Sequence, residues 1–106
     1  MPEAEIARAR TLPSWTARLA LAHTLPRELP SSRAYRFDAA RFRDHRIPTQ
    51  IVLGGESHQR YKDTTALLHE SLAGSKVAVL AGQGHGPIDG APELFAATVM
   101  DFLERN

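Results

Sequence analysis

The stretch Lys76–Gly86, which reads KVAVLAGQGHG, decides the fold class of this chain. Its first half, Lys76–Leu80, is rich in β-branched and aliphatic residues and is therefore predicted to form a buried β-strand. Three glycines at alternate positions follow it, namely Gly82, Gly84 and Gly86. Because glycine reaches positive φ and lets other backbone approach closely, this part is predicted to be a loop. The loop holds one imidazole, His85, and open α/β sheets carry their chemistry in loops at the carboxyl ends of strands.

A second run of the same kind, Gln50–Leu53, ends at Gly54 and Gly55. Between the two runs, residues at helical spacing predict one buried helix face, made of Tyr61, Thr65, Leu68 and Leu72. Gly74 is expected to follow the end of that helix. Two short apolar strands joined by a helix predict a βαβ unit with parallel strands.

The last segment of the chain is predicted to be a helix that begins at Pro92, since proline fits the first turn. Its expected buried face consists of Phe95, Val99, Phe102 and Leu103. The predicted fold class is therefore α/β, with a partial parallel sheet in the order βαβα over residues 47–106.

Residues 1–46 differ in composition, being rich in arginine and proline. We expect a short helix over Glu3–Arg10 and a second one from an N-cap at Ser14 to about His23, where Pro26 blocks continuation. Asp38 is expected to cap a further helix start. The chain thus divides into a helical and connecting segment, 1–46, and a βαβα segment, 47–106.

A sheet of two strands is too small to cover its own apolar residues. Even if Tyr35–Phe37 pairs as a third strand, both sheet edges are open, and few neighbours are left for Ile51, Val52, Val77 and Val79. Each such side chain left in water forfeits roughly 1.5–3 kcal/mol, against a total stability of about 5–15 kcal/mol for a domain. We therefore expect the chain to be one end of a larger sheet, completed by missing strands or by self-association into a homo-oligomer.

Composition excludes several function classes. The 106 residues carry 13 Lys and Arg against 12 Asp and Glu, so no global charge selects nucleic acid or an anionic membrane. Cysteine is absent, which excludes disulfides, thiolate metal sites and a thiol nucleophile. No apolar run reaches the roughly 20 residues that span a bilayer, and the first ten residues do not resemble a secretory signal. We expect a cytoplasmic protein without a cofactor.

Two further site types receive little support. Zinc sites on helices use ligands at i and i+4, and His58, His69 and Glu70 lack that spacing, so no metal is expected. The arginines of the first half would suit nucleic acid only if they shared one face with stacking aromatics. We interpret these arginines as solvated or facing a lid, and a nucleic-acid patch is the weaker alternative. The arginines concerned are Arg27, Arg33, Arg36, Arg41, Arg43 and Arg46.

Four stretches, in this order and spacing, resemble the C-terminal segment of an α/β-hydrolase-fold protein: PTQIVLGGE (48–56), KVAVLAGQGH (76–85), APELF (91–95) and VMDFL (99–103). The helical start of the chain resembles the end of that family's lid region. The resemblance implies an incomplete α/β-hydrolase fold. It also implies an ester or similar acyl compound as the small-molecule substrate.

The resemblance gives His85 the part of the catalytic histidine, the general base that accepts the proton of the nucleophile. In the loop after the first strand, the family's acid position is held by His58 here. Glu56 is the nearest carboxylate and is the candidate acid, although a solvated loop glutamate explains it equally well. Asp89 is expected to help start the final helix instead.

The family's nucleophile motif, G-x-S-x-G, does not occur in the sequence. The nearest stretch, Gly55–Gln59, lacks the second glycine and is interpreted as the acid loop. The predicted function is therefore the C-terminal part of a serine-type hydrolase that carries the general base and is inactive alone. The alternative is a non-catalytic remnant or a self-associating binding protein. The substrate, and whether the chain is a fragment, are left open.

Overall fold

The computed structural model describes residues 3–106, apart from the side chain of Glu5. The chain forms two compact units, Met1–Phe37 and Asp38–Asn106. Within residues 3–106, no helix has the length and apolar character that crossing a membrane requires.

The first unit is helical. It contains α1 (Glu3–Arg10), α2 (Trp15–Leu21), a 3₁₀ helix η1 (Ala22–Thr24) and α3 (Leu25–Ala34). The predicted helix over Glu3–Arg10 is thus confirmed. Ser14 occupies the predicted N-cap position of α2, but its side chain makes no capping hydrogen bond.

The predicted end of the second helix before Pro26 is confirmed, since α2 ends at Leu21. A separate helix, α3, begins at Leu25, so Pro26 lies in its first turn. Proline is tolerated there because the first amides of a helix have no intrahelical acceptor. Pro30 lies inside the same helix, where its missing N–H removes one backbone hydrogen bond.

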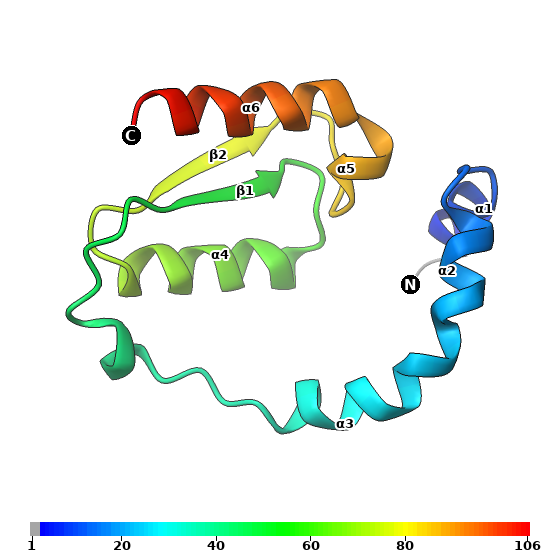
Figure 1. Cartoon of the computed structure of the whole chain (residues 1–106), viewed down its shortest axis with the longest axis horizontal. Coiled ribbons are helices and arrows are strands. Elements are labelled where there is room, and N and C mark those ends of the chain that lie inside the picture. The colour runs from blue at the N-terminus through cyan, green and yellow to red at the C-terminus, as the bar shows by residue number, and fades with distance from the viewer. Residues whose placement is uncertain (1–2) are drawn as a thin grey trace. The chain divides into compact units, whose positions relative to one another are not determined.

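The second unit contains the sheet. Its elements are η2 (Ala39–Phe42), β1 (Gln50–Gly54), α4 (Gln59–Ser71), β2 (Lys76–Leu80), α5 (Pro87–Gly90) and α6 (Pro92–Glu104). Helices α4 and α6 lie on opposite sides of the two strands (Figure 1). The α/β class and the order βαβα are confirmed, apart from the short helix α5, which the sequence analysis missed.

Strands β1 and β2 pair in parallel, in a register that runs from Gln50 opposite Lys76 to Gly54 opposite Leu80. The predicted parallel pairing is therefore confirmed. Within residues 3–106 the sheet has the two predicted strands, and Tyr35–Phe37, considered as a third strand, is irregular and does not pair. Both outer edges of the sheet are thus unpaired in the described part of the chain.

The core is small, as the strand count predicted. Leu80, 4% exposed, and Pro87 are the buried apolar side chains among the described residues. On β2, Val77 and Val79 are 36% and 59% exposed. Apolar strand residues without cover weaken a fold that depends on burial.

The helix faces agree with most of the periodicity. Thr65 of α4 is buried, and the other residues of its predicted face, Tyr61, Leu68 and Leu72, are half-buried. On α6, Phe95, Val99 and Phe102 are half-buried, but the expectation for Leu103 was wrong because this side chain is 60% exposed.

The turns contain one further difference. Asp89 lies in α5, and the N-cap position of α6 is held by Ala91, so Asp89 is not the N-cap residue of the final helix. Asp38 does cap η2, because its carboxylate accepts a hydrogen bond from the amide of Ala40 at 3.0 Å.

Candidate functional site

The loops that follow β1 and β2 are joined by backbone hydrogen bonds. The amide of Gly55 donates to the carbonyl of Leu80, and the amide of Glu56 donates to the carbonyl of Gln83, both at 2.9 Å. Parallel strands end at the same edge of a sheet, so a ladder that continues past the strands holds the two loops side by side. The predicted acid loop and the histidine loop therefore lie next to each other.

Glycine is required where the loops meet. A Cβ built on Gly54 would overlap the carbonyl oxygen of Gly84. Only a residue without a side chain lets the second loop come this close to the end of β1. Gly54 thus fixes the distance between the two loops. The sequence analysis identified this residue only as the end of a strand.

His85 is exposed, and its ring lies against that of Tyr61. The ring centroids are 3.5 Å apart and the planes are inclined by 8°, which is a stacked arrangement. Tyr61 is half-buried and belongs to the first turn of α4. Within the described part of the chain neither ring nitrogen of His85 takes part in a hydrogen bond, and the residue is exposed.

Three of the other four histidines use a ring nitrogen structurally. Nδ1 of His23 lies 2.9 Å from the carbonyl oxygen of Ala20, to which it donates. His45 Nε2 lies 2.8 Å from the hydroxyl of Thr49, and His69 Nδ1 lies 2.8 Å from that of Ser75. Among the five histidines of the sequence, these three are accounted for by local packing, which leaves His58 and His85.

Glu56 contributes its backbone to the junction but not its side chain. The residue is exposed. In the part of the chain that the structure describes, no hydrogen bond or ion pair joins its carboxylate to His85. The fold therefore brings the two predicted site residues onto neighbouring loops without pairing them.

Ser57 and His58 complete the acid loop. Ser57 is 5% exposed, and its hydroxyl finds no hydrogen-bond partner within the described residues. A hydroxyl buried in this way is inaccessible to a substrate, which fits the interpretation of this loop as something other than a nucleophile turn. His58 is exposed at the N-cap of α4 and makes no capping bond through its side chain.

The residues that the sequence analysis missed are Arg60 and Tyr61. Nη2 of Arg60 donates to the hydroxyl of Tyr61 at 2.7 Å, and its guanidinium carbon lies 4.6 Å from the centre of the tyrosine ring. Periodicity identified Tyr61 only as part of a buried face. The signal that could have identified Tyr61 is its position: it is an aromatic residue in the first turn of the helix that follows the acid loop, and so lies near this edge of the sheet.

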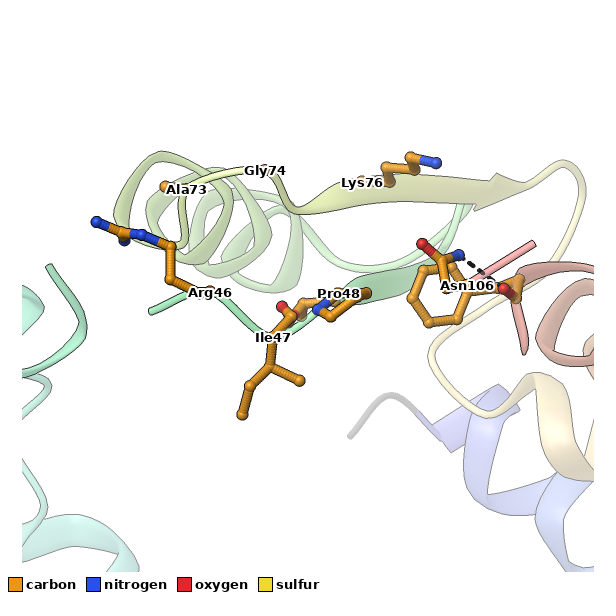
Figure 2. Close-up of a pocket in the computed structure, with 9 residues that line it drawn as sticks. Arg46, Ile47, Pro48, Ala73, Gly74, Lys76 and Asn106 are labelled. Carbon is orange, nitrogen blue, oxygen red and sulfur yellow. Dashed lines mark hydrogen bonds between the residues drawn. The ribbon is translucent and has the colours of Figure 1, made fainter. Parts of the chain in front are cut away.

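A cavity of about 220 Å³ lies at the opposite end of the strands. It is lined by residues around the amino ends of β1 and β2 and the end of α6, namely Arg46, Ile47, Pro48, Thr49, Ala73, Gly74, Lys76, Phe102 and Asn106. Figure 2 shows the charged end of Arg46 extending away from Pro48 and Asn106, on the side of the view opposite to Lys76. The two cationic side chains therefore do not converge on the cavity. It is also remote from His85 along both strands.

Comparison with known proteins identifies no relative. No protein-family model matches the chain, and no curated protein or solved structure matches it either. In residues 3–106, no three His, Asp or Glu side chains are grouped so that they would hold a metal ion.

Proposed function

We propose that this chain is the C-terminal part of an α/β-hydrolase, in which His85 is the general base for hydrolysis of a small-molecule ester. The likeness of the four sequence stretches to that family supports the proposal. The single observation that carries it is the hydrogen bond from the amide of Glu56 to the carbonyl of Gln83. This bond supports the proposal because it joins the loops of Glu56 and His85 at the carboxyl edge of a parallel sheet, where open α/β folds carry their sites.

The proposed chemistry is acyl transfer through a hydroxyl. His85 accepts the proton as the hydroxyl oxygen attacks the ester carbonyl, and it returns that proton to the departing alcohol. Water then attacks the acyl group by the same proton exchange, which releases the acid and restores the hydroxyl. Glu56 is the proposed acid, and its exposed side chain would turn toward His85 when the site is complete.

The hydroxyl and the oxyanion donors are not supplied by these residues, because the sequence lacks the nucleophile motif. Loss of the nucleophile costs several orders of magnitude in rate in an enzyme of this type. The chain alone is therefore expected to be almost inactive, and an N-terminal hydrolase part must supply the remaining strands.

Complementation tests the proposal. The 106-residue chain is produced together with the N-terminal part of an α/β-hydrolase that contains G-x-S-x-G and ends before the acid-bearing strand. The complex is isolated by size-exclusion chromatography, and cleavage of p-nitrophenyl acetate is measured. We expect ester cleavage in the complex that neither part shows alone.

His85→Ala should lower this activity at least a thousandfold, on the order of the losses measured for triad residues. His23→Ala is the matched control, because this imidazole only bonds the carbonyl of Ala20 in the first unit. A stable complex without activity, or full activity in His85→Ala, would refute the proposal.

The exposed side chains of β2 support a second candidate, a non-catalytic protein that self-associates through its open sheet edge. Val79 is 59% exposed on a strand with one unpaired side. An open apolar edge strand is a template for pairing with another chain. In this alternative, a second copy supplies the strands that the sheet lacks.

Sedimentation equilibrium at micromolar concentration distinguishes the two candidates. A dimer that Val79→Lys dissociates, because a lysine opposes edge pairing, would favour self-association. Leu103→Lys is the control, since this side chain is 60% exposed on α6. A well-folded monomer at these concentrations would exclude the second candidate.

A further inference from the structure

The stack between Tyr61 and His85 joins two separate elements of the second unit. Tyr61 stands in the first turn of α4, and His85 lies in the loop after β2. With 3.5 Å between the ring centroids and 8° between the planes, the contact fixes both the position and the tilt of the imidazole. It is the only described side-chain interaction of His85.

Tyr61 is itself held in place. Its half-buried ring belongs to the α4 face that includes the buried Thr65. Arg60 donates to its hydroxyl at 2.7 Å and lies 4.6 Å from its ring centre. A guanidinium near an aromatic ring adds a cation–π attraction. The ring therefore offers a fixed surface to the imidazole.

Stacking leaves the imidazole able to act. The lone pair and the N–H bond of the two ring nitrogens lie in the plane of the ring, whereas the contact with Tyr61 occupies a face. In a Ser-His-Asp triad, a carboxylate bonded to one nitrogen orients the histidine. In residues 3–106 no carboxylate bonds His85, so the tyrosine ring is what orients it.

We propose that Tyr61 is the positioning residue of His85, holding the imidazole through its face and leaving the edge with the two nitrogens accessible to the acid and the nucleophile. The inference rests on the proposed function for its catalytic meaning. A preorganised base loses less freedom when the substrate binds, and a misplacement of about 1 Å can cost up to about a hundredfold in rate.

Proton NMR of the 106-residue chain tests the contact directly. We expect nuclear Overhauser effects between the ring protons of Tyr61 and His85, and upfield-shifted His85 resonances due to the ring current. Tyr61→Phe should retain the shift, whereas Tyr61→Leu should return the resonances to the positions of an unfolded histidine. The His69 resonances and the amide spectrum serve as controls for folding. Absence of the cross-peaks in the wild-type chain overturns the inference without any substitution.

Steady-state kinetics of the complex with the N-terminal hydrolase part test whether Tyr61 positions His85 for catalysis. Tyr61→Leu should lower kcat about tenfold or more with KM little changed, and Tyr61→Phe should restore it. Loss of activity in His85→Ala with normal kcat in Tyr61→Leu would overturn the positioning role and leave the proposed function standing. Full activity in His85→Ala would overturn the proposed function, and with it the catalytic meaning of the stack.

Discussion

Gly54 and Gly84 are in such close contact that a single methyl group on the first would overlap the carbonyl oxygen of the second. Gly54 is also buried at the end of β1. The obstacle is backbone, which cannot rotate away as a flexible side chain can. This contact sets how closely the acid loop and the histidine loop approach.

Gly54→Ala should therefore destabilise the second unit by at least about 1–3 kcal/mol, the range typical of overpacking. The free energy of unfolding is measured by urea denaturation followed by circular dichroism. Gly86→Ala is the matched control, because Gly86 has φ −111° and open space around its Cβ position. Equal stability of the two variants would show that the loops are not in contact.

Leu80→Ala tests how far the stability depends on one buried side chain. Large-to-small changes at buried leucines cost about 2–5 kcal/mol, which is a large part of the stability of a small domain. Leu103→Ala, at a side chain that is 60% exposed, should change the free energy of unfolding by no more than about 0.5 kcal/mol. Similar urea midpoints for both would mean that the core lies elsewhere.

Gly74 has φ +76° in the turn between α4 and β2, with no atom near its Cβ position. Gly74→Ala should therefore cost roughly 1–2 kcal/mol through backbone conformation alone. Asparagine tolerates the left-handed region better, so Gly74→Asn should lose less. Thermal unfolding of the two variants checks the order, and an alanine variant as stable as asparagine would contradict it.

Local patterns predicted the elements of the second unit well. The β-branched runs identified both strands, and the spacing of Tyr61, Thr65, Leu68 and Leu72 identified the covered face of α4. Pro26 was rightly taken as a barrier to α2, but helix α3 was not foreseen, because a proline that breaks one helix fits the first turn of the next. Leu103 was misjudged because periodicity specifies a face but not how far the neighbouring sheet extends.

The site was predictable only in part. That His85 and Glu56 occupy neighbouring loops followed from two parallel strands, since such strands end at one edge. That His85 stacks on Tyr61 did not follow, because this contact depends on the tertiary distance between a loop and a helix start. Sequence spacing carries no information about that distance.

Replacing each of two buried serines by alanine is predicted to change the free energy of unfolding in different directions. Ser57 is 5% exposed, and its hydroxyl has no hydrogen-bond partner among the described residues. Ser75 is 8% exposed, and its hydroxyl oxygen lies 2.8 Å from Nδ1 of His69. Removing a paired buried hydroxyl costs about 0.5–1.5 kcal/mol, but removing an unpaired one is neutral or stabilising. Ser75→Ala should therefore lower the free energy of unfolding, and Ser57→Ala should leave it unchanged or raise it. Because both variants delete one oxygen at nearly equal burial, the comparison cancels the effect of lost volume. A loss in Ser57→Ala as large as that in Ser75→Ala would show that the Ser57 hydroxyl is hydrogen-bonded after all.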